Sequence, residues 1–221
     1  MKKNYCLIFA VAMLSLALVS CSKKDDPASI ETSSNKVTIK VPSGAQLDKI
    51  KVLSGDYLLA SVSAKAGNTV NLELQNMPAN QLNKVTDIFD TSLKISDNSA
   101  MTSWSNSSYY NISFKGYQSY GSQYDVESCT FYLKNPTTDS EIYYVYSDKN
   151  VNIHGSTGST FDKDIVNLSF NNGWNMVYYT TSQKDTTYYY DVWEGLVTKT
   201  INIDYYNTVQ SIPSDVGWYV Y

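Results

Sequence analysis

The sequence predicts an all-β protein made of one or more antiparallel β-sandwiches, with at most one short helix near residues 79–89. Three observations lead to this prediction. Short runs of alternating polar and apolar residues recur along the chain. Turn residues separate these runs at intervals of about 8–12 residues, which is typical of sandwiches and barrels. The chain also has 20 tyrosines, and tyrosine packs well across neighbouring strands.

Four short strands are expected in the front part of the chain. Residues 36–41 alternate polar and apolar side chains, as a half-buried strand does. Further strands are expected from Ile50 onward, at 57–62 and at 69–74, with glycine-containing turns between them. Four strands in about 40 residues, joined by tight turns, indicate an antiparallel sheet.

The short helix is expected where this alternation stops. Leu82, Val85 and Phe89 follow one another at helical spacing after a proline. Residues 87–106 are polar and rich in serine, which predicts a long loop or a boundary.

This loop divides the predicted domains. Residues 36–100 are expected to form a small β-sandwich-like module, and residues 101–221 a larger, tyrosine-rich antiparallel β domain. A single core shared by the two is the alternative. The larger part contains 18 of the 20 tyrosines. Because neighbouring residues of a strand point to opposite faces, each pair of consecutive tyrosines should have one inward and one outward member.

Nine strands are expected in the larger part, at residues 109–114, 125–133, 141–146, 151–154, 165–170, 176–181, 187–193, 197–203 and 218–221. The dipeptide Asn172-Gly173 lies between two of them. Asn-Gly is the preferred sequence of a two-residue hairpin turn, so we expect these two strands to pair.

The N-terminus has the layout of a secretory signal. Lys2 and Lys3 precede an uncharged run of about 15 residues, whereas a membrane-spanning helix needs roughly 20. Residues 1–20 are therefore predicted to be a signal peptide. Residues 21–35 are polar and poor in apolar side chains, which predicts a flexible tether.

Two short motifs at this junction resemble lipoprotein signals. The segment Leu18-Val19-Ser20-Cys21 resembles the bacterial lipobox, which implies that Cys21 becomes the first residue of the mature chain and carries acyl chains. More than one acyl chain gives stable membrane anchoring. The following Ser22-Lys23-Lys24-Asp25-Asp26 is similar to the export signal of Bacteroidetes surface lipoproteins. Together they imply a lipid-anchored outer-membrane protein exposed at the cell surface; an ordinary signal peptide and linker are the alternatives.

Two further segments resemble known patterns. Residues 37–77, with their turn at Ala66-Gly67-Asn68, resemble the opening strands of transthyretin-like or carboxypeptidase-regulatory-like modules, which implies a β-sandwich there. Residues 151–175, which end in Gly-Trp-Asn, resemble a pattern in uncharacterised Bacteroidetes lipoproteins and imply no particular activity.

Composition argues against a nucleic-acid partner. All 17 basic residues are lysines, and the formal net charge is −4 at pH 7. Arginine supplies the forked hydrogen bonds used on phosphates and guanine, and this chain has none. Of the three cysteines, Cys6 lies in the predicted signal peptide and Cys21 is the lipidation site that the lipobox resemblance implies. Cys129 is then alone, so the mature chain has no internal disulfide.

No catalytic, metal or cofactor site is predicted, and the chain is not expected to be an enzyme. The single histidine, His154, lacks the Gly-x-Ser-x-Gly motif of a serine hydrolase and the partners of a zinc site. A glycoside hydrolase is the remote alternative, because such enzymes need two carboxylates. The candidate pairs are Asp125 with Glu127, Asp162 with Asp164, and Asp191 with Glu194. Ordinary outward-facing strand residues explain these pairs more simply.

Aromatic side chains are the main functional lead. Tryptophan and tyrosine offer a flat apolar face with a hydrogen-bonding edge, which suits stacking on sugars and recognition of proteins. The candidate ligand-binding residues are Trp104, Trp174, Trp193, Trp218, Tyr188 and Tyr190. We therefore expect a non-enzymatic binding or structural role at the cell surface, with a glycan or protein partner.

A fibre subunit similar to the Bacteroidetes fimbrillins is the alternative. These are lipoproteins with transthyretin-like domains that polymerise by strand exchange. Residues 218–221 would then be the donor strand, or else the last strand of the chain's own sheet. The absence of arginine and the short chain depart from that family's pattern.

Overall fold

The computed structural model describes residues 35–104, 112–120, 124–189 and 196–221. For residues 104, 185–189 and 196–199 it describes the backbone alone. The predicted signal peptide, Cys21 and nearly all of the predicted tether lie outside the described residues. Within the described residues, no helix has the length and apolar character needed to cross a membrane.

The fold is all-β, as predicted. The strands are β1 (Lys36–Lys40), β2 (Lys49–Ser54), β3 (Tyr57–Ser63), β4 (Thr69–Glu73), β5 (Asn83–Lys84), β6 (Lys94–Ile95), β7 (Met101–Trp104), β8 (Ile112–Tyr120), β9 (Tyr124–Asn135), β10 (Ser140–Ser147), β11 (Val151–Gly158), β12 (Asp162–Phe170), β13 (Gly173–Tyr189), β14 (Leu196–Val209) and β15 (Gly217–Val220).

The expected helical segment contains two short turns. They are the 3-10 turn η1 (Ala79–Gln81) and the four-residue α1 (Val85–Ile88). Leu82 and Lys84 between them have extended backbone angles, so the helical spacing of the apolar residues does not produce a continuous helix.

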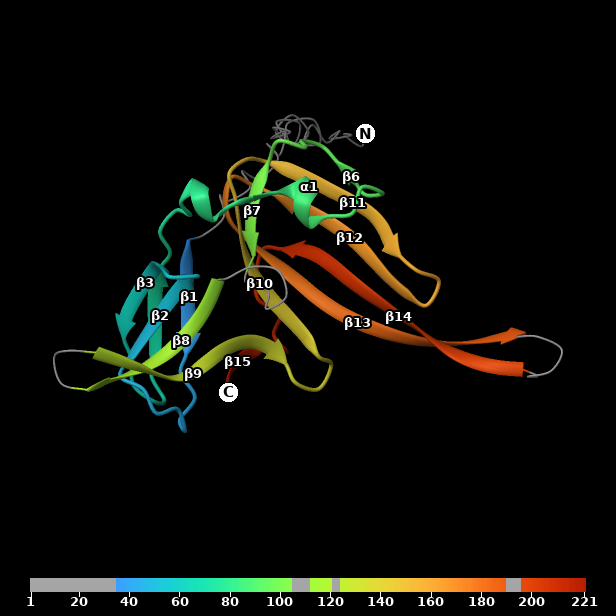
Figure 1. Ribbon diagram of the computed structural model, residues 1–221. Helices are drawn as coiled ribbons and strands as arrows, with labels where there is room; N and C mark the ends of the chain where they lie inside the picture. Colours follow the sequence, from blue (N-terminus) through green and yellow to red (C-terminus); the bar gives the residue numbers. More distant parts are fainter. Residues whose placement is uncertain (1–34, 105–111, 121–123, 190–195) are drawn as a thin grey trace, which may run out of the picture. The chain divides into compact units, whose positions relative to one another are not determined.

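The strands form one large and one small sheet (Figure 1). The large sheet has the order β3-β2-β8-β9-β10-β13-β14-β12-β11-β6, with β15 paired to β9, β7 to β10, and β5 to β7. The small sheet contains β1 and β4. All pairs are antiparallel except β12 with β14, which is parallel. β14 lies between β12 and β13, which run in opposite directions, and it is antiparallel to β13.

This arrangement corrects the hairpin predicted at Asn172-Gly173. β12 and β13 follow each other directly, but β13 pairs with β10 and β14 instead. β14 lies between the two strands and pairs with both, which accounts for the departure, and the buried side chain of Asn175 bonds within the turn. Its Oδ1 accepts from Asn171 N at 2.9 Å, and its Nδ2 donates to the carbonyls of Asn171 and Gly173 at 2.8 and 2.9 Å. The turn is therefore held by a side chain and leaves both strands free to pair elsewhere.

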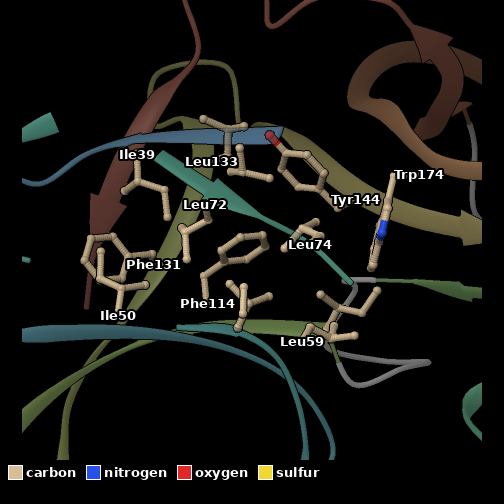
Figure 2. Packing of buried hydrophobic residues seen from close by; sticks show 14 of the residues in the cluster. Ile39, Ile50, Leu59, Leu72, Leu74, Phe114, Phe131, Leu133, Tyr144 and Trp174 are labelled. Atoms are coloured by element: carbon tan, nitrogen blue, oxygen red, sulfur yellow. The ribbon is translucent and has the colours of Figure 1, made fainter. Parts of the chain in front are cut away.

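The first hydrophobic cluster lies between the small sheet and part of the large one (Figure 2). Its side chains come from both predicted domains, because β1 to β4 pack against β8, β9 and β10. Figure 2 labels ten of its members: Ile39, Ile50, Leu59, Leu72, Leu74, Phe114, Phe131, Leu133, Tyr144 and Trp174. β2 also pairs with β8 along its whole length. The chain on the two sides of residue 100 therefore shares this core.

The second cluster covers the opposite face of β10 and β13. Val85, Leu93 and Ala100 from the connecting segment pack there against apolar side chains of β10 to β13. Tyr143 and Val145 of β10 belong to this cluster, whereas Tyr144 and Tyr146 belong to the first one. Tyr143 and Tyr144 therefore point to opposite faces of β10, as expected for consecutive residues of a strand. Both faces are buried here, so neither side chain is exposed.

Gly116 of β8 is required by close packing. A Cβ at this position would lie 2.5 Å from Cys129 Sγ and 3.0 Å from Leu47 Cδ2. Gly116 and Cys129 are register partners across β8 and β9, next to a bulge that leaves Ser128 unpaired. The half-buried Cys129 thus fills the space that a side chain would otherwise occupy.

We expect Gly116→Ala to destabilise the protein by about 1–3 kcal/mol, the usual cost of overpacking a core. Urea unfolding followed by tryptophan fluorescence measures this. Gly44→Ala is the matched control, because a Cβ there meets nothing within 4 Å. Adding Cys129→Ala should recover part of the loss, since it removes the clashing sulfur. Equal stability of Gly116→Ala and Gly44→Ala would contradict the packing argument.

Candidate functional site

Trp174 does not belong to an exposed binding surface. It is 2% exposed, its ring lies 5.3 Å from that of Tyr146, and its Nε1 donates to the carbonyl of Gln75 at 3.1 Å. Trp174 is the register partner of Tyr146 on β10, and both side chains belong to the first cluster. The structure therefore assigns it to the core, and its proposed ligand-binding role is corrected.

Trp218 has a structural position as well. It is half-buried, with its ring 5.2 Å from Phe114 and 6.4 Å from Phe131. Its Nε1 donates to the carbonyl of Thr38 at 2.9 Å, which connects β15 to β1. Trp193 and Tyr190 lie outside the described residues, as do the side chains of Trp104 and Tyr188. Of the six predicted residues, Trp174 and Trp218 are the two whose side chains the structure describes, and both pack in the first cluster.

Another set of aromatic residues does form a surface. The inward side chains of β9 and β15 are apolar and pack into the first cluster, so the alternate residues point outward. The tyrosine–lysine face is defined as the aromatic, charged and threonine side chains on the outward side of β2, β8, β9 and β15, together with the adjoining Tyr221. Its members are Lys49, Lys51, Lys115, Tyr117, Asp125, Glu127, Thr130, Tyr132, Lys134, Tyr219 and Tyr221.

Strand register sets the order of side chains on this face. Lys51 pairs with Lys115, and Lys115 pairs with Thr130. Tyr221 exchanges two backbone hydrogen bonds with Thr130, at 2.9 and 3.1 Å, and so continues the same row. In the next row, Tyr219 lies directly opposite Tyr132. Side chains from β2, from the consecutive strands β8 and β9, and from β15 thus lie side by side.

Three exposed tyrosines form the end of the face nearest β15. The exposed fractions are 39% for Tyr132, 37% for Tyr219 and 68% for Tyr221. The rings of Tyr132 and Tyr221 meet edge to face, with their centroids 5.5 Å apart. Lys134 Nζ lies 4.4 Å from the centroid of the Tyr221 ring, in cation–π geometry. A hydrogen bond to Tyr221 raises the pKa of Lys134. These contacts restrain the rings of Tyr132 and Tyr221.

The other end of the face is an ion-pair network. Asp125 lies 3.0 Å from Lys49 Nζ and 2.6 Å from Lys51 Nζ. Hydrogen bonds from Lys51 and then Lys49 lower the pKa of Asp125 to about 2. Lys51 Nζ also lies 4.6 Å from the centroid of the Tyr117 ring. Lys115 donates to Glu127 at 2.8 Å. Because Lys51 and Lys115 are directly opposite, these carboxylates offset a repulsive pair.

This network bears on the glycosidase alternative. A general acid of a glycosidase needs a carboxyl with a raised pKa. Asp125 has a lowered pKa because of its lysine partners, and Glu127 is occupied by Lys115. Both carboxylates of the first predicted acidic pair, Asp125 and Glu127, are thus paired with lysines, and neither has the environment of a general acid.

The other predicted acidic residues are differently placed. Asp164 is opposite Asp204 across the parallel strands β12 and β14. Burial, then the charges of Asp204 and Asp162, raise the pKa of Asp164. Asp191 and Glu194 lie outside the described residues.

The exposed His154 has its Nδ1 3.0 Å from Asn167 Oδ1. Within the described ranges, no three His, Cys, Asp or Glu side chains are grouped to hold a metal ion.

Sequence reasoning missed the exposed tyrosines of this face. The alternation of residues 130–134 and 218–221 already marked Tyr132, Tyr219 and Tyr221 as one side of two strands. It did not show that β15 pairs with β9, which is what brings them together. Tryptophans were preferred as candidates, but large rings are the side chains that a core buries most readily.

Comparison of the chain with known protein families, curated proteins and solved structures returned no match. The tyrosine–lysine face, with its exposed rings and its charged groups, is therefore the candidate functional site.

We expect Asp125→Asn to lower the stability of the folded protein at neutral pH. The lowered pKa of Asp125 means that its charged form stabilises the fold above its usual pKa of 3.8, and that this contribution is lost as the pH falls through about 2. Urea unfolding of the wild type and the variant should differ at pH 7 and converge at low pH. A difference that is the same at both pH values would contradict the ion-pair assignment. Asp56→Asn, on the exposed turn between β2 and β3, is the matched control.

Proposed function

We propose that this chain is a lipid-anchored protein of the outer membrane that binds a glycan at the cell surface through its tyrosine–lysine face. The observation that carries the proposal is the group of exposed rings at Tyr132, Tyr219 and Tyr221 on one side of β9 and β15. Exposed aromatic rings at fixed positions on a sheet are suited to stacking on sugar rings.

The polar neighbours of these rings support a glycan as the occupant. Thr130 and Lys134 lie next to the tyrosines on β9, and the phenol groups add hydroxyl donors and acceptors. A sugar presents hydroxyl groups around an apolar ring face, so it needs this combination of stacking and hydrogen bonding. The surface extends across the neighbouring strands β2, β8, β9 and β15, so an extended chain can contact several of them at once.

Charge distribution argues against a protein interface as the main role. The central part of protein–protein interfaces is depleted of charged residues. On this face the charged side chains of Lys49, Lys51, Lys115, Asp125 and Glu127 form a network at one end, beside the aromatic ones. Burying them under a protein would cost desolvation of three ion pairs. A hydrated glycan leaves them in water.

The anchor part of the proposal rests on the N-terminal sequence. Leu18-Val19-Ser20-Cys21 resembles a lipobox, and the polar residues that follow resemble a tether. Acyl chains on Cys21 would hold the protein at the membrane, and the tether would allow the β domain to reach ligands at a distance.

We expect Tyr221→Ala and Tyr132→Ala each to weaken glycan binding by about tenfold or more, because removal of an anchoring aromatic residue commonly costs that much affinity. The assay titrates detergent-solubilised protein with each polysaccharide of a panel, and isothermal calorimetry measures the heat of binding. Tyr57→Ala is the control, since Tyr57 is 39% exposed but belongs to β3.

Two results would contradict the glycan proposal. One is the absence of binding across the panel; the other is binding that Tyr57→Ala weakens as much as Tyr221→Ala does. Retention of a specific protein from the cell surface, with loss of that protein in the Tyr221→Ala variant, would point to a protein partner instead.

The anchor is tested separately. Cys21→Ser should move the protein from the membrane fraction to the soluble fraction and abolish incorporation of radiolabelled palmitate, because the thiol that carries the lipid is gone. Cys129→Ser is the control and should remain lipidated, since Cys129 is a half-buried strand residue. Membrane association and labelling that survive Cys21→Ser would refute the anchor.

A further inference from the structure

We propose that the glycan recognised by the tyrosine–lysine face is acidic, with carboxylate or sulfate groups along its chain, and that Lys134 binds one of these groups. This inference rests on the proposed function and deepens it, because it names the class of glycan. Its basis is the difference between Lys134 and the other lysines of the same face.

The other three lysines are already paired with carboxylates. Lys49 and Lys51 share Asp125 at 3.0 and 2.6 Å, and Lys115 is 2.8 Å from Glu127. Among the described residues, Lys134 has no carboxylate within 4.0 Å of its ammonium group. Its ammonium group contacts Tyr221, through the ring and through a hydrogen bond. Lys134 is thus the cation of this face that remains available to an acidic ligand.

Two acidic residues near Lys134 leave it available. Glu141 is its register partner on β10, and Asp139 precedes β10; the charges of both favour the protonated ammonium. The Glu141 side chain is instead hydrogen-bonded to Tyr143, whose pKa is raised by burial and then by Glu141. Glu141 leaves the same face of the sheet as Lys134, but its carboxylate is engaged by Tyr143, and among the described residues neither acid lies within ion-pair distance of Lys134.

The position of Lys134 relative to the rings suits a substituted sugar. Lys134 and Tyr132 are two residues apart on β9, so their side chains leave the same face about 6.8 Å from each other. Tyr221 lies next to both, in contact with the Lys134 ammonium and with the Tyr132 ring. A sugar stacked on Tyr132 or Tyr221 would present an acidic substituent within reach of Lys134.

The ion pair predicts how binding should respond to salt and charge. An exposed ammonium–carboxylate contact is modest, so we expect Lys134→Gln to weaken binding of an acidic glycan by about three- to tenfold. Added salt should weaken binding as well, since it screens exposed charges. A neutral glycan would depend on the tyrosines alone and would respond to neither change.

The experiment compares four forms of the detergent-solubilised protein: wild type, Lys134→Gln, Lys134→Arg and Lys40→Gln. Lys40→Gln is the matched control because it makes the same charge change at an exposed position of β1. Each form is titrated by calorimetry at low and at raised salt. The probes are polygalacturonate as the uronate, dextran sulfate as the sulfated glycan, and soluble xylan and dextran as weakly charged and neutral chains.

The inference is supported if an acidic probe binds, if Lys134→Gln weakens that binding, and if Lys134→Arg and Lys40→Gln do not. The probe that binds then identifies the acidic group as carboxylate or sulfate. Equal weakening of acidic and neutral probes by Lys134→Gln would overturn the inference, because Lys134 would then act only by positioning Tyr221.

Failure of this inference can be told apart from failure of the proposed function. If only dextran binds, with loss in Tyr221→Ala but not in Lys134→Gln, the glycan proposal stands and the acidic class is wrong. If no probe binds to the wild type, both proposals fail.

Discussion

Burial of β10 on both of its faces is the constraint on which this structure depends. Tyr144 and Tyr146 pack into the first cluster, whereas Tyr143 and Val145 pack into the second. β13 continues the same double burial, with Trp174 on one side and Val177 on the other. A strand with two apolar faces needs cover on both sides, and here the front strands cover one and the segment around α1 covers the other. The two predicted modules are consequently parts of one packed unit.

The same packing sets the composition of the tyrosine–lysine face. Inward packing of Phe131, Leu133 and Trp218 determines that Tyr132 and Tyr219 point outward. A slip of one residue in register would exchange the two faces, so burial of the inner side protects the arrangement of the outer side. The face is therefore positioned by the core, and rings held in this way lose little freedom when a ligand binds.

Electrostatics divides the face into two regions with different properties. Around Asp125 and Glu127 the lysines are compensated, and the network contributes to stability. The ammonium group of Lys134, by contrast, lies over the ring of Tyr221 and forms no ion pair with a carboxylate among the described residues. Recognition is expected in the second region, because forming a contact there does not require an existing ion pair to break.

Much of the fold class was determined by the sequence alone, because strand alternation and turn residues are local properties. Residues 36–41 and 69–74, for example, alternate as expected and contain β1 and β4. Pairing was not determined locally. The Asn172-Gly173 turn suggested a hairpin, but the side chain of Asn175 holds the loop and β14 separates the two strands. Trp174 likewise had the character of a binding residue and lies in the core. The alternation of residues predicts that a strand has two different faces. Only the tertiary structure determines which face is covered and which neighbouring strand completes the exposed surface.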